Sequence, residues 1–159
     1  MRVFACILLL LTLLAAAFWG YCYHGAQMVI EGVAVSLSPA VDAMGTYNQV
    51  KTQVSQGTFL GRMYREANFL MPERYTFLTL TVRMSNRGLF PQDWIRIEVA
   101  PDPADIALLF NERTPSLSGM SRGDFHATLL MDTGASTSRA LSVKYYVLGQ
   151  PFTVSYQMP

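Results

Sequence analysis

Apolar and polar residues alternate along much of the second half of the chain. In residues 75–85, Leu78, Leu80 and Val82 occupy every second position, and in residues 93–99 Ile95 and Ile97 do the same. A period of two is typical of a strand with one buried face. We therefore predict strands at residues 75–85 and 93–99.

Five further segments have the alternation, or the short apolar run bounded by turn residues, that marks a strand. They are residues 31–39, 106–110, 124–131, 140–148 and 151–157. With the two strands above they make about seven, separated by turn signals near every ten residues, which is typical of an antiparallel β-sandwich. The predicted fold class is therefore all-β, with the sandwich domain at residues 31–159.

Residues 40–72 show neither the clear alternation of a strand nor a clear helical pattern. Five apolar residues would share one face of a helix: Val41, Met44, Tyr47, Val50 and Val54. Gly45 disfavours that helix, and we predict short strand pieces joined by loops instead. Within residues 58–72, three aromatic side chains are expected to cover the core: Phe59, Tyr64 and Phe69.

The N-terminal segment is continuously apolar. The run from Val3 to Tyr23 has no charged residue, and as a helix it would be about 32 Å long at about 1.5 Å per residue. The hydrocarbon core of a bilayer is about 30 Å thick. Arg2 precedes the run, and Trp19 lies near its other end, where amphipathic rings favour the headgroup layer. We predict that residues 1–24 are a signal-anchor transmembrane helix with its N-terminus in the cytoplasm.

A cleaved signal peptide is the alternative for this segment, with Ala15 and Ala17 as small residues at a cleavage site. In the first case the protein is a single-pass protein of a bacterial cell membrane, with a connector at residues 25–30 and the C-terminal domain outside. In the second case the domain is secreted. N-terminal sequencing of fractionated cells separates the two.

Composition narrows the function classes. The 159 residues carry a formal net charge of +1, and 14% of them are charged, which disfavours a nucleic-acid-binding surface. Both cysteines, Cys6 and Cys22, precede the predicted domain, so it has neither a disulfide framework nor a cysteine-rich metal site. His24 and His126 are the only histidines and lie far apart in the sequence. We therefore predict no metal and no cofactor.

Two motifs carry a resemblance to a known family. The segment T-L-T-V-R-M-S-N-R-G-L followed by W-I-R-I-E-V, and the L-S-G-M-S-R-G-D-F-H-A-T-L segment that starts at Leu117, are similar to strand and turn segments of bacterial extracytoplasmic immunoglobulin-like modules of the CARDB and fibronectin type III sort. The resemblance covers roughly residues 75–156. It implies an immunoglobulin-like sandwich with a tendency toward adhesion or complex assembly, and it implies no catalytic residue.

One further motif offers an enzymatic alternative. L-L-M-D-T-G-A-S, which includes Asp132, resembles the active-site loop of aspartic peptidases. In that family two aspartates share one proton and activate a water molecule, so a single motif implies a homodimer. Too few residues follow Asp132 for the flap and supporting strands of that family. A hairpin loop between residues 124–131 and 140–148 is the plainer interpretation.

We expect a non-catalytic module that binds or positions another protein of the cell envelope. Three tyrosines near the C-terminus are candidates for a binding surface: Tyr145, Tyr146 and Tyr156. Tyr145 and Tyr146 are consecutive, so one of them points outward if the strand prediction holds. The loops at residues 86–92 and 132–139 are further candidates, because loops on a rigid scaffold commonly carry binding residues.

Overall fold

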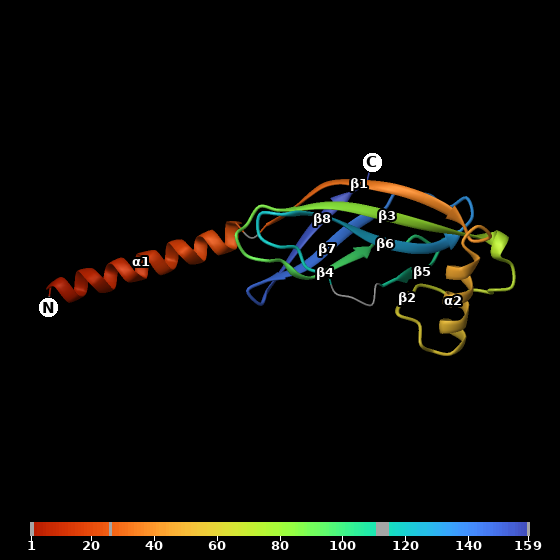
Figure 1. The fold of residues 1–159 in the computed structure, drawn as a ribbon, viewed down its shortest axis with the longest axis horizontal. Coiled ribbons are helices and arrows are strands. Elements are labelled where there is room, and N and C mark those ends of the chain that lie inside the picture. The colour runs from red at the N-terminus through yellow and green to blue at the C-terminus, as the bar shows by residue number, and fades with distance from the viewer. Residues whose placement is uncertain (1, 26, 111–114, 159) are drawn as a thin grey trace.

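The computed structural model describes residues 2–25, 27–110 and 115–158, apart from the side chains of residues 2 and 22–25. The side chains of Cys22, Tyr23 and His24 therefore lie outside the described part of the chain. An N-terminal helix, α1 (Arg2–Gly25), projects from one end of a body built from strands (Figure 1). Its segment Val3–Tyr21 is long and apolar enough to be a membrane span or a signal sequence.

Within the described residues, eight strands form two antiparallel sheets. The first sheet has the order β1 (Met28–Pro39), β3 (Tyr75–Asn86), β6 (Arg122–Asp132), β5 (Asp105–Leu109) and β2 (Gly61–Met63). The second has the order β4 (Asp93–Val99), β7 (Ala140–Val147) and β8 (Gln150–Gln157). The all-β prediction is confirmed at this level.

The two sheets stack on a shared apolar core. Alternate side chains of β3, among them Leu78 and Leu80, are fully buried there with Leu129 of β6. Ile95 of β4 and Val143 of β7 belong to the same core and come from the second sheet. Burial of these large apolar side chains, at roughly 1.5–3 kcal/mol each, is the main force that holds the sheets together.

The first strand begins earlier than predicted. β1 starts at Met28, so residues 28–30 belong to the first sheet and not to a connector at residues 25–30. Val29 and Ile30 pair with Ser85 and Met84 of β3. The Met28 amide also donates a hydrogen bond to the Tyr145 hydroxyl at 2.9 Å. Pairing partners that are distant in the sequence thus extend the strand beyond its alternating part.

Residues 40–72 are where the prediction is wrong. Residues 44–55 form a helix, α2 (Met44–Ser55), and not strand pieces. The outer face of the first sheet is apolar at one end, where Phe77 and Leu130 lie, and Tyr47 and Val50 of α2 are buried against this area. The local preference for a helix is weak, and tertiary packing on this face stabilises α2, as is common for marginal helices.

The connection that follows α2 behaves as predicted. Phe59 and Phe69 pack against the outer core beneath α2, and Tyr64 packs against the core between the sheets. The Tyr64 hydroxyl also donates to the carbonyl of Val99 at 3.3 Å. Residues 61–63 of this connection form the short edge strand β2, which joins the first sheet by pairing with β5.

α1 distinguishes the two ends of the body. α1 ends at Gly25 and β1 begins at Met28, so the loops at residues 87–92, 115–121 and 148–149 lie at the end beside α1 (Figure 1). We call this the proximal end. The distal end, on the far side of the body, carries α2, the short 3-10 helix η1 (Pro72–Arg74) and the loop that follows β6 (Figure 1).

The β7–β8 connection is a two-residue hairpin turn. Val147 pairs with Gln150, so the turn residues are Leu148 and Gly149, one position before the predicted turn. Both have positive φ, at 50° and 80°. Such turns match the twist of the strands and prefer Asn-Gly, whereas a leucine in the left-handed region is strained.

We expect Leu148→Asn to stabilise the fold. Asparagine tolerates the left-handed conformation, and Leu148 is exposed and contributes little burial, so the free energy of unfolding should rise by about 0.5–1 kcal/mol. Urea unfolding of the full chain in detergent, followed by circular dichroism, measures this. Leu148→Val is the control and should lower stability, because a β-branched residue fits positive φ worst. A loss of stability in Leu148→Asn would contradict the strain argument.

Candidate functional site

The D-T-G-A-S segment lies at the distal end and crosses from one sheet to the other. Asp132 ends β6 in the first sheet, and the next strand, β7, belongs to the second sheet, so the predicted hairpin between them is wrong. The Thr133 amide donates to the carbonyl of Arg74 at 2.9 Å, and Gly134 has a φ of 84° that suits glycine. These contacts make the segment a crossing loop held by η1.

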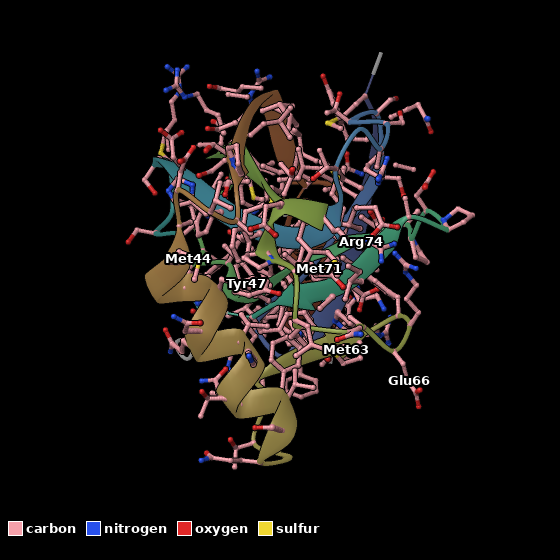
Figure 2. The ribbon with its side chains drawn as sticks, turned by 90° about the vertical axis from the view of Figure 1, so that its right-hand side faces the viewer. Met44, Tyr47, Met63, Glu66, Met71 and Arg74 are labelled. Atoms are coloured by element: carbon pink, nitrogen blue, oxygen red, sulfur yellow. The ribbon has the colours of Figure 1, made fainter. Side chains whose placement is uncertain are left out.

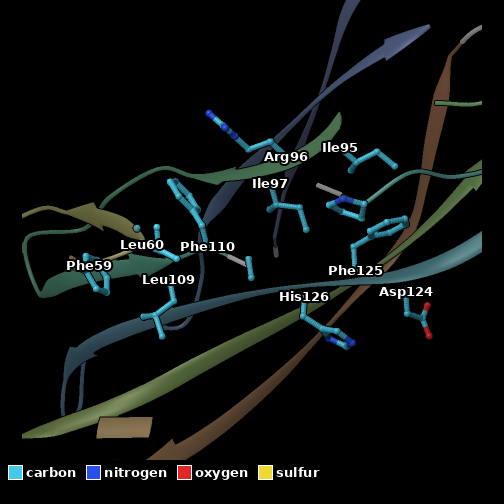
Figure 3. Close-up of a pocket in the computed structure, with 13 residues that line it drawn as sticks. Phe59, Leu60, Ile95, Arg96, Ile97, Leu109, Phe110, Asp124, Phe125 and His126 are labelled. Atoms are coloured by element: carbon cyan, nitrogen blue, oxygen red, sulfur yellow. The ribbon is translucent and has the colours of Figure 1, made fainter. Parts of the chain in front are cut away.

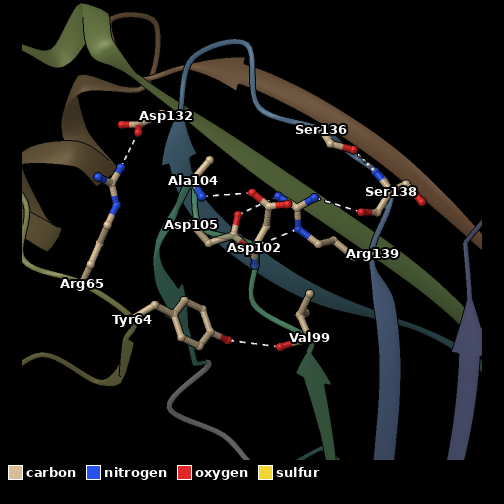
Figure 4. Close-up of polar contacts among 10 residues, drawn as sticks. All are labelled: Tyr64, Arg65, Val99, Asp102, Ala104, Asp105, Asp132, Ser136, Ser138 and Arg139. Atoms are coloured by element: carbon tan, nitrogen blue, oxygen red, sulfur yellow. Dashed lines mark hydrogen bonds and ion pairs between the residues drawn. The ribbon is translucent and has the colours of Figure 1, made fainter.

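The Asp132 carboxylate is paired with a cation. It forms an ion pair with the guanidinium of Arg65 (Figure 4), and both side chains are partly exposed. Aspartic-peptidase chemistry needs two carboxylates that share a proton. The group that the structure places against Asp132 is an arginine and not a second carboxylate.

A buried ion pair anchors the same loop from its other end. Arg139 donates to both carboxylate oxygens of Asp105, at 2.7 and 3.1 Å, and both side chains are almost completely buried (Figure 4). The Asp102 amide donates to Asp105 Oδ2 at 2.8 Å, and Arg139 Nη1 donates to the carbonyl of Ser138 at 2.9 Å. The pair therefore joins β5 of the first sheet to the start of β7 in the second.

The three candidate tyrosines do not form one surface. Tyr145 is buried in the core, and this burial raises the pKa of its hydroxyl. Tyr156 is half-buried and packs against the core. Tyr146 is exposed beside Trp94, with ring centroids 6.2 Å apart. The expectation that one of the two consecutive tyrosines points outward is confirmed, and Trp94 is its neighbour.

A cleft of about 1180 Å³ opens between the sheets along β4 and β5. Ile97, Phe110 and Phe125 project toward its interior, whereas Asp124 and His126 point away from it (Figure 3). These two polar side chains face other partners: Asp124 accepts from Arg83 at 3.0 Å, and His126 contacts Thr81 at 3.0 Å. The guanidinium of Arg96, which also lines the cleft, lies 5.5 Å from the centroid of the Phe110 ring. The hydrogen bond from Arg83 holds the pKa of Asp124 below its usual value. The cleft is thus a mainly apolar recess, and the polar side chains among its described lining residues do not converge on one point (Figure 3).

Within the described residues, no group of three or more histidine, cysteine, aspartate or glutamate side chains lies close enough to hold a metal ion.

The distal end carries exposed apolar side chains beside charged ones. Leu70, Met71 and Met44 are exposed, although each is large and apolar. The same end has a hollow of about 500 Å³, and Met63 and Glu66 are among the residues that line it. Met44, Met63, Glu66 and Met71 all lie on the end that faces the viewer in Figure 2. We call the surface formed by these five residues the distal face.

Sequence analysis missed both the distal face and the buried Asp105–Arg139 pair. The pair joins residues 34 positions apart, and charged residues near turns give no sign that they will be buried. The sequence does hold a signal for a cover on the outer face of the first sheet, because Phe77 and Leu130 are apolar at positions that alternate with the inward-facing residues. An apolar patch on both sides of a sheet needs a second cover, and residues 40–72 were the available segment.

No family model matches this chain, and the search of curated proteins found none similar to it.

We expect the buried Asp105–Arg139 pair to contribute far more to the stability of the fold than the exposed Arg65–Asp132 pair. Arg139→Met leaves the Asp105 carboxylate buried without its cation, which should lower the free energy of unfolding by about 3–5 kcal/mol. Arg65→Met, the matched control at the exposed Asp132 pair, should lower it by less than about 1 kcal/mol. Denaturant unfolding of the full chain in detergent measures both changes. Equal effects of the two substitutions would contradict this assignment.

Proposed function

We propose that the chain is a membrane-anchored, extracytoplasmic, immunoglobulin-like module without catalytic activity, which binds or positions another protein of the cell envelope through its distal face. The observation that carries this proposal is the exposed apolar pair Leu70 and Met71, which directly precedes η1 at the distal end of the body.

The membrane anchor is supported by the properties of α1. Its apolar segment Val3–Tyr21 is unburied by the rest of the chain, which leaves about thirty ångströms of apolar surface for lipid to cover. Trp19 and Tyr21 lie at the end of α1 next to the body, as expected for aromatic residues at a membrane interface. The only charged residue before the span, Arg2, favours a cytoplasmic N-terminus and an external body.

The strand order supports the immunoglobulin-like identity. Constant-type immunoglobulin domains have strands A, B, E and D in one sheet and C, F and G in the other. If β1 is strand A and β3 is strand B, then β1-β3-β6-β5 against β4-β7-β8 reproduces this order. α2 and β2 are then an insertion between strands A and B, and that insertion builds most of the distal face.

The chemistry of the distal face supports binding to a protein. Methionine side chains such as the exposed Met44 and Met71 adapt to varied partner surfaces. An apolar centre with charged residues such as Glu66 at its margin is the usual anatomy of an interface. The buried Asp105–Arg139 pair and the contacts of η1 hold the neighbouring loop in place. Rigid presentation lowers the entropy that is lost on binding.

The peptidase alternative receives no support from the surroundings of Asp132. Arg65 neutralises its carboxylate, and the motif lies at the open end of the body and not in the cleft. Purified full-length protein should therefore show no acid-dependent proteolysis. Proteolysis that disappears in Asp132→Asn would favour the enzyme over the binding module.

Site-specific photocross-linking in intact cells tests the binding role. A photoreactive residue at position 70 should give a discrete adduct with a second protein, and Met71→Asp in the same chain should reduce its yield about tenfold or more, because a charge would be placed at the centre of the contact. A probe at Val35, which is exposed on β1, is the matched control and should give no adduct. Equal adducts from positions 70 and 35, or none from position 70, would contradict the proposed binding face.

A further inference from the structure

Three large apolar residues share an unusual combination of properties at the proximal end. Trp94, Met120 and Leu148 are the non-glycine residues with positive φ within the described part of the chain, at 55°, 53° and 50°. Their exposed fractions are 67%, 74% and 59%. Each therefore combines a disfavoured backbone conformation with an apolar side chain left in water.

Neither property is needed for the fold. Left-handed positions are ordinarily occupied by glycine or asparagine, which adopt them with little strain. A polar side chain at the same positions would also avoid exposing apolar surface. Backbone strain is found preferentially at functional sites. At these three positions it coincides with an apolar side chain that points outward, which is the pattern expected of a functional surface. Trp94 lies at an irregularity in the register between Asp93 and Arg96, where β4 pairs with β7. Such irregularities change the direction of a side chain.

The proximal loops that carry these residues are bound to one another. The Met120 amide donates to the carbonyl of Gly88 at 2.9 Å, and a side chain at Gly119 would collide with the backbone of Leu89. Trp94 packs against Tyr146, two positions before Leu148. Leu89 is exposed as well. We call Leu89, Trp94, Met120 and Leu148 the proximal rim.

One buried side chain joins two of these loops. The Asn86 side-chain amide donates to the carbonyls of Phe90 and Ser118 at 2.8 and 3.0 Å, and its oxygen accepts from the Gly88 amide at 2.9 Å. Asn86 ends β3 and connects the loops through these hydrogen bonds. The loops that carry Leu89 and Met120 are therefore held together.

A contact between α1 and the loop at residues 87–92 fixes the position of this surface along the axis of α1. The ring of Phe90 packs edge-on against that of Phe18, with centroids 6.0 Å apart. Phe18 lies inside the apolar segment Val3–Tyr21, about 4–5 Å before its end at about 1.5 Å per residue. The loop that carries Leu89 and Phe90 thus reaches the level of the last turn of the apolar segment.

We propose that the proximal rim is seated in the interfacial layer of the lipid bilayer that α1 spans, so that the body stands on the membrane at its proximal end. This inference rests on the proposed membrane anchor. Lipid is the occupant that fits, because Leu89 of the rim adjoins Phe90, which contacts the apolar segment of α1. Large apolar and aromatic side chains on rigid loops are suited to the boundary between headgroups and acyl chains.

The two tryptophans of the chain, Trp19 and Trp94, test the inference and its premise separately. The full chain is reconstituted into vesicles of phosphatidylcholine and phosphatidylglycerol, with or without lipids brominated near the headgroup end of the acyl chain. Trp94→Phe leaves Trp19 as the reporter of α1, and Trp19→Phe leaves Trp94 as the reporter of the rim. We expect brominated lipid to quench both, with a loss of Trp94 fluorescence comparable to that of Trp19.

The outcomes are distinguishable. If Trp19 is quenched and Trp94 is not, α1 is in the membrane but the rim is not seated in lipid, and the inference is overturned while the anchor stands. If neither is quenched, the anchor itself fails and the inference fails with it. A rim that binds a protein instead of lipid also gives no quenching of Trp94 in these vesicles, because they contain no other protein.

Substitutions within the rim provide the matched comparison in the Trp19→Phe chain. Leu148→Asn and Met120→Asn relieve backbone strain and remove apolar contact with lipid, so each should reduce quenching of Trp94 while raising the melting temperature. Leu70→Asn at the distal face should leave the quenching unchanged. Rim substitutions that raise the melting temperature without any loss of quenching would show that these residues do not hold the body against the bilayer.

Discussion

The contact between Phe18 of α1 and Phe90 of the body fixes the polarity of the whole molecule. α1 ends at Gly25 and β1 begins at Met28, and the Phe18–Phe90 contact brings the apolar helix against a loop of the body. Because β1 then runs the length of the first sheet, one end of the body is held beside the helix and the other is held away from it. The distinct roles that we propose for the proximal rim and the distal face follow from this arrangement.

Packing on both faces of the first sheet explains how a small sandwich supports a distal face. Leu78 and Leu129 point inward to the second sheet, whereas Phe77 and Leu130 point outward and are covered by α2. The outer cover is an insertion between the first two long strands, so it adds a surface without altering the strand order. The Asp105–Arg139 pair then ties the two sheets together beside that insertion.

The inner core could be predicted because period-two burial is a local property of the sequence, and every predicted strand from residue 75 onward corresponds to a strand of the body. α2 was missed because its helix is stabilised by contacts with a sheet face formed from distant residues. The D-T-G-A-S motif was ambiguous for the same reason, since Arg65, which pairs with Asp132, lies 67 positions away. Tyr145 and Tyr146 were correctly assigned to opposite faces, but sequence gave no indication that the exposed one would lie beside Trp94.

Neutron reflectometry of the full chain in a supported bilayer tests most directly whether the body stands on the membrane with its distal face outward. β1 has 12 residues, or about 40 Å at about 3.3 Å per residue, and it runs roughly in line with α1 (Figure 1). The account predicts a protein layer of about this thickness that begins within the headgroups, with no water layer between. A protein layer separated from the headgroups by water, or a much thinner layer from a body lying flat, would contradict it.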